Sequence, residues 1–187
     1  MKKIFMMAVM AAATLTANAQ WWAGGELELS GKHKVGAENS ETTFAIQPEV
    51  GYSLTDKIDV ALALGYRHLK NQTITVDEYA VQGTGNQFTV NPYVRYKFVK
   101  AGNFFAFVDG GIAFSTSHLN GVENNINSFG VGFAPGIAYS VSNKVTLVSH
   151  LGDGLYFNHT WRKDDYHKNS YGFKFANAIS FGAYYSF

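Results

Sequence analysis

Apolar and polar residues alternate one by one along most of the chain after residue 20. From Phe44 to Leu54, every second residue is bulky and apolar apart from Pro48, and the residues between are small, polar or charged. Segments that begin at Ile58 and Phe88 repeat this alternation. A period of two is typical of a β-strand with two chemically different faces. The pattern therefore predicts an all-β fold.

The alternation predicts eight antiparallel strands whose connections are short and long in turn. The predicted strands are 21–30, 42–54, 58–70, 87–99, 103–116, 128–141, 145–158 and 171–187. Short turns are expected at 55–57, 100–102 and 142–144, and longer polar loops at 31–41, 71–86, 117–127 and 159–170. Each strand is long enough to cross a bilayer, which takes roughly 9–11 residues. Short periplasmic and longer external connections are typical of outer-membrane barrels, and they place both termini on the periplasmic side.

A repeated motif supports the strand count. Pro-x-(Val/Ile)-x-Tyr occurs at Pro48–Tyr52, Pro92–Tyr96 and Pro135–Tyr139, and Asn177–Phe181 keeps its last two features with Asn in the proline position. Four copies in one phase indicate four hairpins. Because proline cannot donate to a strand ladder, we expect a bulge or an unpaired neighbour at each proline.

The two faces of the strands differ in a way that indicates a membrane. One face is large and apolar throughout, whereas the other carries Glu26, Glu28, Glu49, Asp59, Asp109, Arg67, Arg95, Lys97 and Lys174. A soluble β-protein with this polar face inside would bury those charges. Aromatic residues near the strand ends predict the two girdles of a membrane barrel: Trp21, Tyr52, Tyr66, Phe88, Tyr96, Phe98, Phe104, Phe114, Phe129, Tyr139 and Phe157.

The charged face should then point into a narrow lumen. Eight strands enclose an interior that side chains can fill. Five acids and four bases nearly balance there, which predicts an ion-pair network that plugs the lumen, with a conducting path as the alternative. His150 is expected to be a hydrogen-bonded interior residue. Simple alternation turns Ser149 and Asp153 toward lipid, so Asp153 lies either at the outer interface or at a bulge near Gly152 or Gly154.

The first residues have the three parts of a secretory signal. Lys2 and Lys3 precede an apolar stretch from Ile4 to Leu15, which is too short to span a bilayer comfortably, and Ala17-Asn18-Ala19 matches the cleavage pattern. We therefore expect a signal peptide at 1–19 and a barrel domain at 20–187. Cysteine is absent, and 15 basic residues face 14 acidic ones, so neither disulfides nor nucleic-acid binding is expected. The 15 Phe, 11 Tyr and 19 Gly suit strands and tight turns.

The C-terminus carries a family resemblance. Ile179 to Phe187 has apolar residues at every second place, with Tyr185 before the final Phe187. This ending resembles the signal that the outer-membrane barrel-assembly machinery reads on its substrates. The whole segment 20–187 resembles the small eight-stranded outer-membrane β-barrel family typified by the OmpX and OmpA transmembrane barrels. The resemblance implies location in the cell outer membrane, contact with lipid and lipopolysaccharide, and the assembly machinery as a partner.

Enzymes occur on such barrels, and two of their motifs bear on this chain. Lipid A deacylase barrels carry His-x-Ser, and none of the histidines here has Ser two places later. Palmitoyltransferase barrels use His, Asp and Ser at the outer rim, for which the candidates are His118 with Ser115 and Ser117, or His159 with Asp164 and Asp165. His159 and His167, with those aspartates, are also the candidate metal ligands. Solvated loop residues are the favoured interpretation, so no catalytic, cofactor-binding or metal residue is assigned.

The sequence thus predicts a non-enzymatic, up-and-down transmembrane barrel with a plugged lumen. Its function would be envelope structure or an interaction of its external loops, such as adhesion, and Trp161 and Tyr166 make the last loop a candidate for binding an extracellular ligand. The alternative is a narrow transporter for small solutes with a side opening.

Overall fold

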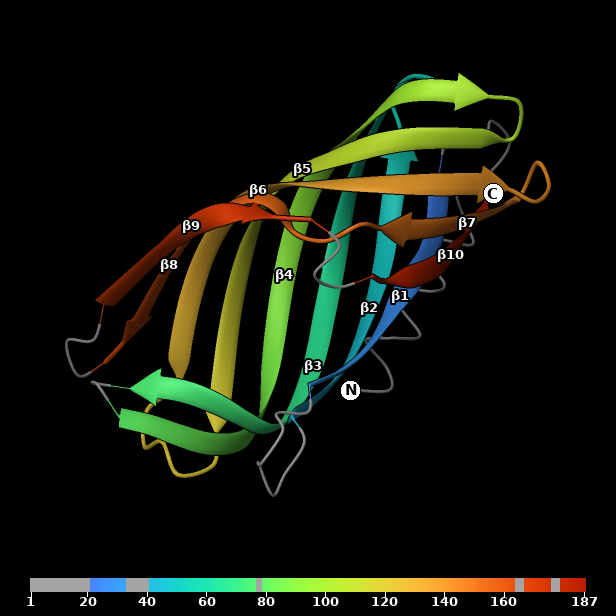
Figure 1. Ribbon diagram of the computed structural model, residues 1–187. Coiled ribbons are helices and arrows are strands. Elements are labelled where there is room, and N and C mark those ends of the chain that lie inside the picture. Colours follow the sequence, from blue (N-terminus) through green and yellow to red (C-terminus); the bar gives the residue numbers. More distant parts are fainter. Residues whose placement is uncertain (1–20, 33–40, 77–78, 164–166, 176–178) are drawn as a thin grey trace.

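The computed structural model describes residues 21–32, 41–76, 79–163, 167–175 and 179–187. These residues form one antiparallel sheet that curves round into a barrel (Figure 1). Its strands are β1 (Trp21–Lys32), β2 (Glu41–Ser53), β3 (Ile58–Val76), β4 (Tyr79–Ala101), β5 (Phe104–Leu119), β6 (Ile126–Ser140), β7 (Val145–His150), β8 (Gly154–Arg162), β9 (His167–Lys174) and β10 (Phe181–Ser186). Among the described residues, no helix is long and apolar enough to cross a membrane.

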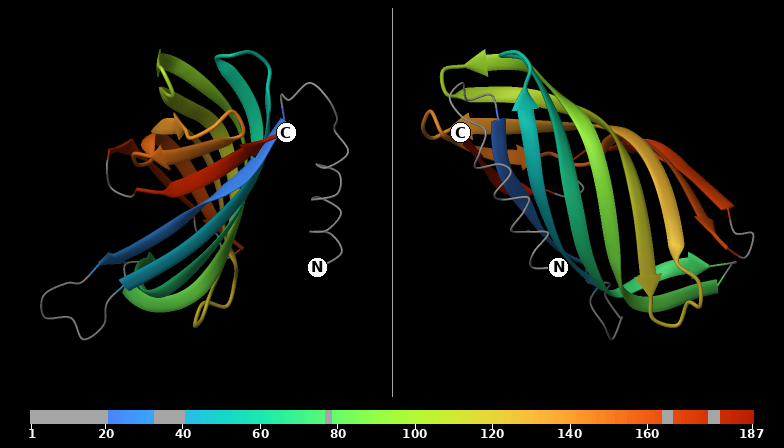
Figure 2. Two further views of the ribbon diagram at one scale, coloured as in Figure 1. Left: turned by 90° about the vertical axis from the view of Figure 1, so that its right-hand side faces the viewer. Right: turned by 180° about the vertical axis from the view of Figure 1, so that it is seen from behind.

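The ten strands occupy eight positions around the barrel. β1 to β6 pair in chain order, β7 pairs with both β6 and β10, and β10 pairs with β1, which closes the ring. β8 continues the position of β7 along β6, and β9 pairs with β8. The predicted eight-stranded barrel is therefore confirmed. The seventh and eighth strands, however, are each divided in two. The turns after β2, β4 and β6 lie at the same end of the barrel as the C-terminus (Figures 1 and 2).

Two of the predicted external loops are wrong in part. β3 extends to Val76 and β4 begins at Tyr79, so most of the predicted loop 71–86 is a hairpin. This hairpin bends beyond a register shift between Leu69 and Gln72, and it runs toward the β8–β9 hairpin (Figures 1 and 2). The last loop, predicted at 159–170, consists largely of the ends of β8 and β9. Backbone pairing thus continues into segments that are too rich in polar residues to be expected as strands.

The proline motifs coincide with interruptions in the ladders. The β2–β3 ladder skips from Ile46 to Glu49 across Pro48, and the β4–β5 ladder skips from Val90 to Tyr93 across Pro92. Pro135 faces the break between β7 and β8, where its carbonyl accepts a hydrogen bond from Leu151 N at 2.9 Å. The expected bulge or unpaired neighbour is thus present at all three prolines. Asn177 of the fourth copy lies outside the described residues, as do residues 1–20, so the signal peptide stays a prediction.

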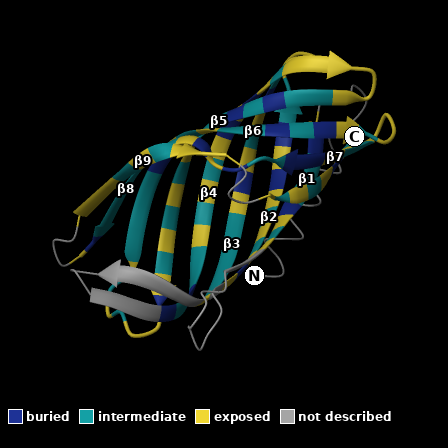
Figure 3. Cartoon of the chain, viewed as in Figure 1, coloured by how far each residue is buried: buried dark blue, intermediate teal, exposed yellow. Residues whose placement is uncertain are grey.

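The outer face of the barrel is apolar and exposed, as the alternation predicts. Leu62 and Leu64 of β3 are 39% and 51% exposed, whereas Ala63 between them is fully buried. Exposed and covered positions alternate along the strands in Figure 3. Ring pairs such as Trp21–Tyr52 and Phe114–Phe129, with centroids 5.0 and 5.1 Å apart, lie on this face near opposite ends of the strands. These pairs belong to the predicted aromatic girdles.

The seventh strand resolves the uncertainty about Ser149 and Asp153. Ser149 pairs with Ile137, and the residue is only 9% exposed, so neighbouring residues cover it. Gly152 and Gly154 have φ angles of 103° and 59°, in the left-handed region that favours glycine. This bulge places Asp153 3.6 Å from Lys174, so the bulge, one of the two alternatives for Asp153, is present.

Candidate functional site

Arg95 lies at the centre of the inner half of the lumen, which is the half nearer the C-terminus and the turns after β2, β4 and β6. It is the most deeply buried charge there. Alternation along β4 points its side chain inward, directly across the ladder from Asp109 of β5. The guanidinium donates to both carboxylate oxygens of Asp109, from Nε at 2.8 Å and from Nη2 at 2.7 Å. Arg95 is only 1% exposed and Asp109 only 8%. A planar, bidentate pair of this kind is the geometry in which buried charges are best compensated.

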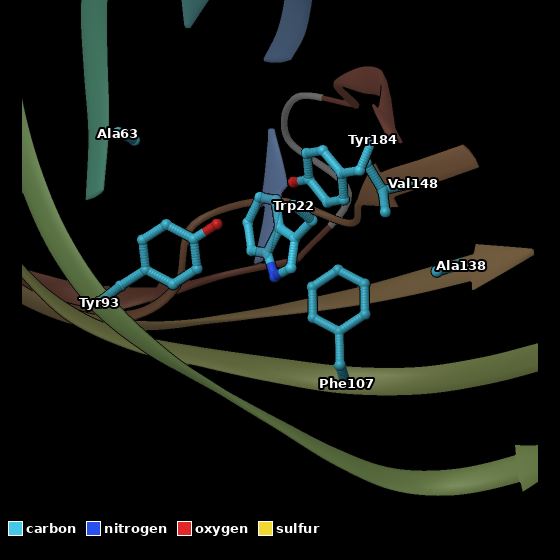
Figure 4. Packing of buried hydrophobic residues seen from close by; sticks show 7 residues of the cluster. All are labelled: Trp22, Ala63, Tyr93, Phe107, Ala138, Val148 and Tyr184. Carbon is cyan, nitrogen blue, oxygen red and sulfur yellow. The ribbon is translucent and has the colours of Figure 1, made fainter. Parts of the chain in front are cut away.

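Aromatic rings enclose the Arg95 guanidinium. Its carbon lies 4.0 Å from the ring centroid of Phe107 and 5.1 Å from that of Tyr184, with Tyr93 and Trp22 at 5.5 and 5.7 Å. These four rings come from four strands and converge in the lumen (Figure 4). Cation–π contacts strengthen when water is excluded, so the rings stabilise the charge while they fill the space.

His150 joins a second group of carboxylates to this centre. Its Nδ1 lies 2.9 Å from Glu26 Oε1, and its Nε2 lies 2.8 Å from Asp109 Oδ2. The Tyr184 hydroxyl is within hydrogen-bond distance of Glu26 at 3.0 Å and of Glu49 at 3.1 Å. Ser180 also donates to Glu26. His150 is therefore a hydrogen-bonded interior residue, as the sequence predicts.

The remaining predicted inward charges are also paired. Lys97 lies 2.8 Å from Asp59 near the periplasmic end, and Arg67 lies 2.9 Å from Glu28 in the outer half. Glu49 accepts a hydrogen bond from Tyr93 at 2.5 Å. Eight of the nine predicted charges and His150 thus form ion pairs and hydrogen bonds with one another or with neighbouring polar side chains inside the barrel, whereas Lys174 pairs with the exposed Asp153. Among the described residues, no buried side-chain nitrogen or oxygen lacks a hydrogen-bond partner. We call this group the plug; it consists of the partly buried His150 and the buried residues Trp22, Glu26, Glu49, Tyr93, Arg95, Phe107, Asp109 and Tyr184.

Three aromatic members of the plug were not predicted to face inward. Trp22, Phe107 and Tyr184 stand at strand positions whose phase is otherwise polar or small. Two glycines make room for them, because a Cβ on Gly51 would collide with the Trp22 ring and one on Gly136 with the Phe107 ring. The signal that could have identified them is a bulky ring at an inward position near the periplasmic end of a strand.

A cavity of about 570 Å³ lies on the outer side of the plug. Its lining includes Glu26, Asp109 and His150 of the plug, and farther out Arg67 and Lys174. The side chains of Arg67 and Lys174 are 43% and 47% exposed. The inner half of the lumen is therefore densely packed, whereas the outer half holds a cavity whose lining is part polar and part apolar.

The barrel wall beside this cavity is incompletely paired. β1 pairs with β10 only from Trp22 to Leu27. Within the described part of the chain, no strand pairs with the rest of β1 on that side, and β9 pairs only with β8. Ladder closure is thus complete in the inner half of the wall and incomplete in the outer half.

The histidines considered for chemistry do not assemble a catalytic or metal group in the described structure. His118 bonds to Asn125 at 3.1 Å, and His159 bonds to Asn169 at 2.7 Å. The imidazole of His159 stacks between Trp161 and His167, with centroid distances of 5.6 Å to each. Within the described ranges, no group of three or more His, Asp or Glu could hold a metal ion. Asp164, Asp165 and Tyr166 lie outside those ranges.

An up-and-down barrel with an apolar outer face and an ion-paired interior defines a small transmembrane β-barrel. The chain belongs to the outer membrane protein beta-barrel domain family, whose model matches residues 4–187. It is an outer-membrane protein, as the resemblance implied.

Solved structures share this fold. Neisserial surface protein A is similar with a TM-score of 0.56 and 16% identity, over 91% of this chain and 100% of that chain. Outer membrane protein W of E. coli is similar with a TM-score of 0.52 and 14% identity, over 92% and 100%. At these identities the likeness shows the fold alone. No curated protein matches the chain.

Proposed function

We propose that this protein is a non-enzymatic barrel whose lumen is closed by the plug, and that it contributes to the envelope or to interactions at the cell surface. The carrying observation is the bidentate Arg95–Asp109 pair, buried among the rings of Phe107, Tyr93, Tyr184 and Trp22. A through-path for solutes would have to break these contacts. Removing one partner from a buried ion pair lowers the free energy of unfolding by about 3–5 kcal/mol.

Planar-bilayer recording tests the closed lumen. The protein as it stands should show no discrete conductance steps, because ions would have to displace the buried pair. A Trp22→Ala, Phe107→Ala variant removes two rings of the plug and should conduct, provided that heat-modifiable gel migration shows a folded barrel. Steady conductance by the unchanged protein would refute the closed lumen.

Surface interaction is supported by the outer end of the β8–β9 hairpin. His159, Trp161 and His167 form a continuous row of stacked rings directly beyond Phe157 and Tyr171, which pair on the apolar face. Rigid scaffolds commonly present binding residues in this way at their loop ends. A lipopolysaccharide or extracellular-ligand contact at this row, and reading of the C-terminal strand by the assembly machinery, are parts of the same proposal.

The second candidate is a narrow transporter with a side opening. The observation that favours it is the outer half of β1 beside the cavity, which pairs with β2 on one edge but with no described strand on the other. Uptake of small solutes into liposomes that contain the folded protein would support it. Because amides, hydroxyls and charged groups contribute to the cavity lining, polar solutes should then be taken up in preference to purely hydrophobic ones.

A further inference from the structure

The outer cavity has a composition that differs from an ordinary small-molecule pocket. Pockets for drug-sized ligands are lined predominantly by apolar and aromatic side chains. Here the wall formed by β4, β5, β6 and β8 presents amides and hydroxyls: Gln87, Thr89, Ser115, Ser128, Asn158 and Thr160. Thr89 and Ser115 already share a hydrogen bond at 2.9 Å, but an acyl chain could not use the remaining donors and acceptors of this wall. A polar ligand therefore suits the wall better than a hydrocarbon does.

Small residues let these polar side chains lie against the wall. A Cβ on Gly130 would collide with the Asn158 amide oxygen, and one on Gly172 would come within 3.2 Å of the Tyr156 hydroxyl. Ala113 lies between Gly111 and Ser115 on the inward phase of β5 and also lines the cavity. The glycines therefore set the polar groups back and leave the space in front of them open.

The opposite side of the cavity supplies charged groups that already have partners. Arg67 pairs with Glu28 at 2.9 Å and Lys174 with Asp153 at 3.6 Å, and each of the two cations stays more than 40% exposed. The Lys174 ammonium also lies 4.6 Å from the Tyr156 ring centroid. Compensated charges do not select a charged ligand, but their remaining donors and acceptors can still hydrogen-bond to a neutral one.

We propose that this cavity binds a polyhydroxylated group, the saccharide of a free sugar or of a glycolipid head. A sugar hydroxyl both donates and accepts, so it matches a wall of mixed amides, hydroxyls and paired charges. The volume of about 570 Å³ lies within the range of ligand cavities, roughly 300–1,000 Å³. This proposal depends on the proposed function in one respect: the plug forms the inner end of the site.

Two routes lead to this site, and they correspond to the two sources. A free saccharide would enter from the outer end of the lumen. A lipid-borne saccharide would enter between β1 and β9, where Leu27 and Glu28 on one margin and Lys174 and Ser180 on the other line the cavity. The same wall chemistry serves both.

Amide shifts in the folded full-length protein test the site. In one arm, glucose, galactose, maltose and sucrose are titrated against the protein in micelles. In the other arm, nanodiscs of phosphatidylcholine are compared with nanodiscs that also contain monogalactosyl diacylglycerol. We expect saturable shifts at Asn158, Gln87 and their strand neighbours. Shifts in the first arm identify a free saccharide, and shifts in the second alone identify a glycolipid head. No saturable shift in either arm overturns the proposal and leaves a water-filled cavity.

Matched variants locate the binding. Ala113→Leu fills the cavity and Thr89→Val removes a hydroxyl at nearly constant shape, and each should weaken binding by about tenfold or more. Ala183→Leu adds the same side chain as the first variant to the exposed outer face of β10 and should leave binding unchanged. Heat-modifiable migration verifies that each variant is folded. Unchanged affinity in both cavity variants would place the sugar elsewhere and overturn the inference. Neither result depends on whether the plug conducts, which the bilayer recording tests separately.

Discussion

The two halves of the lumen solve the same problem in different ways. In the inner half, Arg95 and Asp109 are almost fully buried and are compensated by a bidentate pair and surrounding rings. In the outer half, Arg67 and Glu28 form a single contact beside a water-accessible cavity. An inward charge can be tolerated either by complete pairing in a dry site or by access to water. The first solution fills the inner half with packed side chains, whereas the second leaves space.

The largest expected effect follows from removing the cation in each half. Arg95→Met should lower the free energy of unfolding by about 3–5 kcal/mol, because the Asp109 carboxylate loses its main partner in a dry site. Arg67→Met should lower it by less than about 1 kcal/mol, because Glu28 can be hydrated. Urea unfolding of the barrel in lipid bilayers measures both values. Equal losses would mean that the two halves are equally dry, and the comparison would fail.

A glycine in each half gives the second test. Gly136→Ala places a methyl group against the Phe107 ring in the packed half. Overpacking of this kind costs about 1–3 kcal/mol. Gly65→Ala places its methyl group 3.3 Å from Thr89 Cβ beside the cavity, where the neighbour has room to move. Its cost should stay below about 1 kcal/mol. The same unfolding assay applies, and a larger loss for Gly65→Ala would contradict the assignment of free space to the outer half.

Much of this architecture was predictable because lipid imposes a strict rule on the strands. The membrane demands an apolar residue at every second place, so the strand phase and the inward charges could be identified from the sequence. The partner of each charge depends on register, which alternation leaves open. Arg95 faces Asp109 across one ladder, whereas Arg67 reaches Glu28 from two strands away.

The errors have physical causes as well. The hairpin ends beyond Leu69 and His159 are rich in polar residues, so their composition resembled that of loops. The short alternation at Ile74, Val76, Tyr79 and Val81 was the signal of a hairpin that was missed. The division of the seventh strand depends on positive φ angles at Gly152 and Gly154, and glycine in a strand does not by itself specify a bulge. The inward rings of the plug were counted neither as core nor as girdle, because a membrane barrel was expected to have a polar interior throughout.

The smallest effect concerns the wall rather than the lumen, and amide hydrogen exchange resolves it residue by residue. Gly182–Tyr185 of β10 pair with β1 on one side and with β7 on the other, so consecutive amides there should all be protected. β9 pairs only with β8 among the described strands, and alternate amides of an antiparallel edge point away from its single partner. Every second amide of His167–Lys174 should therefore exchange at least about tenfold faster than its neighbours, equivalent to roughly 1.4 kcal/mol in local opening. The matched reference is β5, which is paired along both edges. Continuous protection along β9 would show that its free edge pairs with another strand in solution. The outer wall would then be closed, and the route between β1 and β9 would be lost while the inner plug remained unchanged.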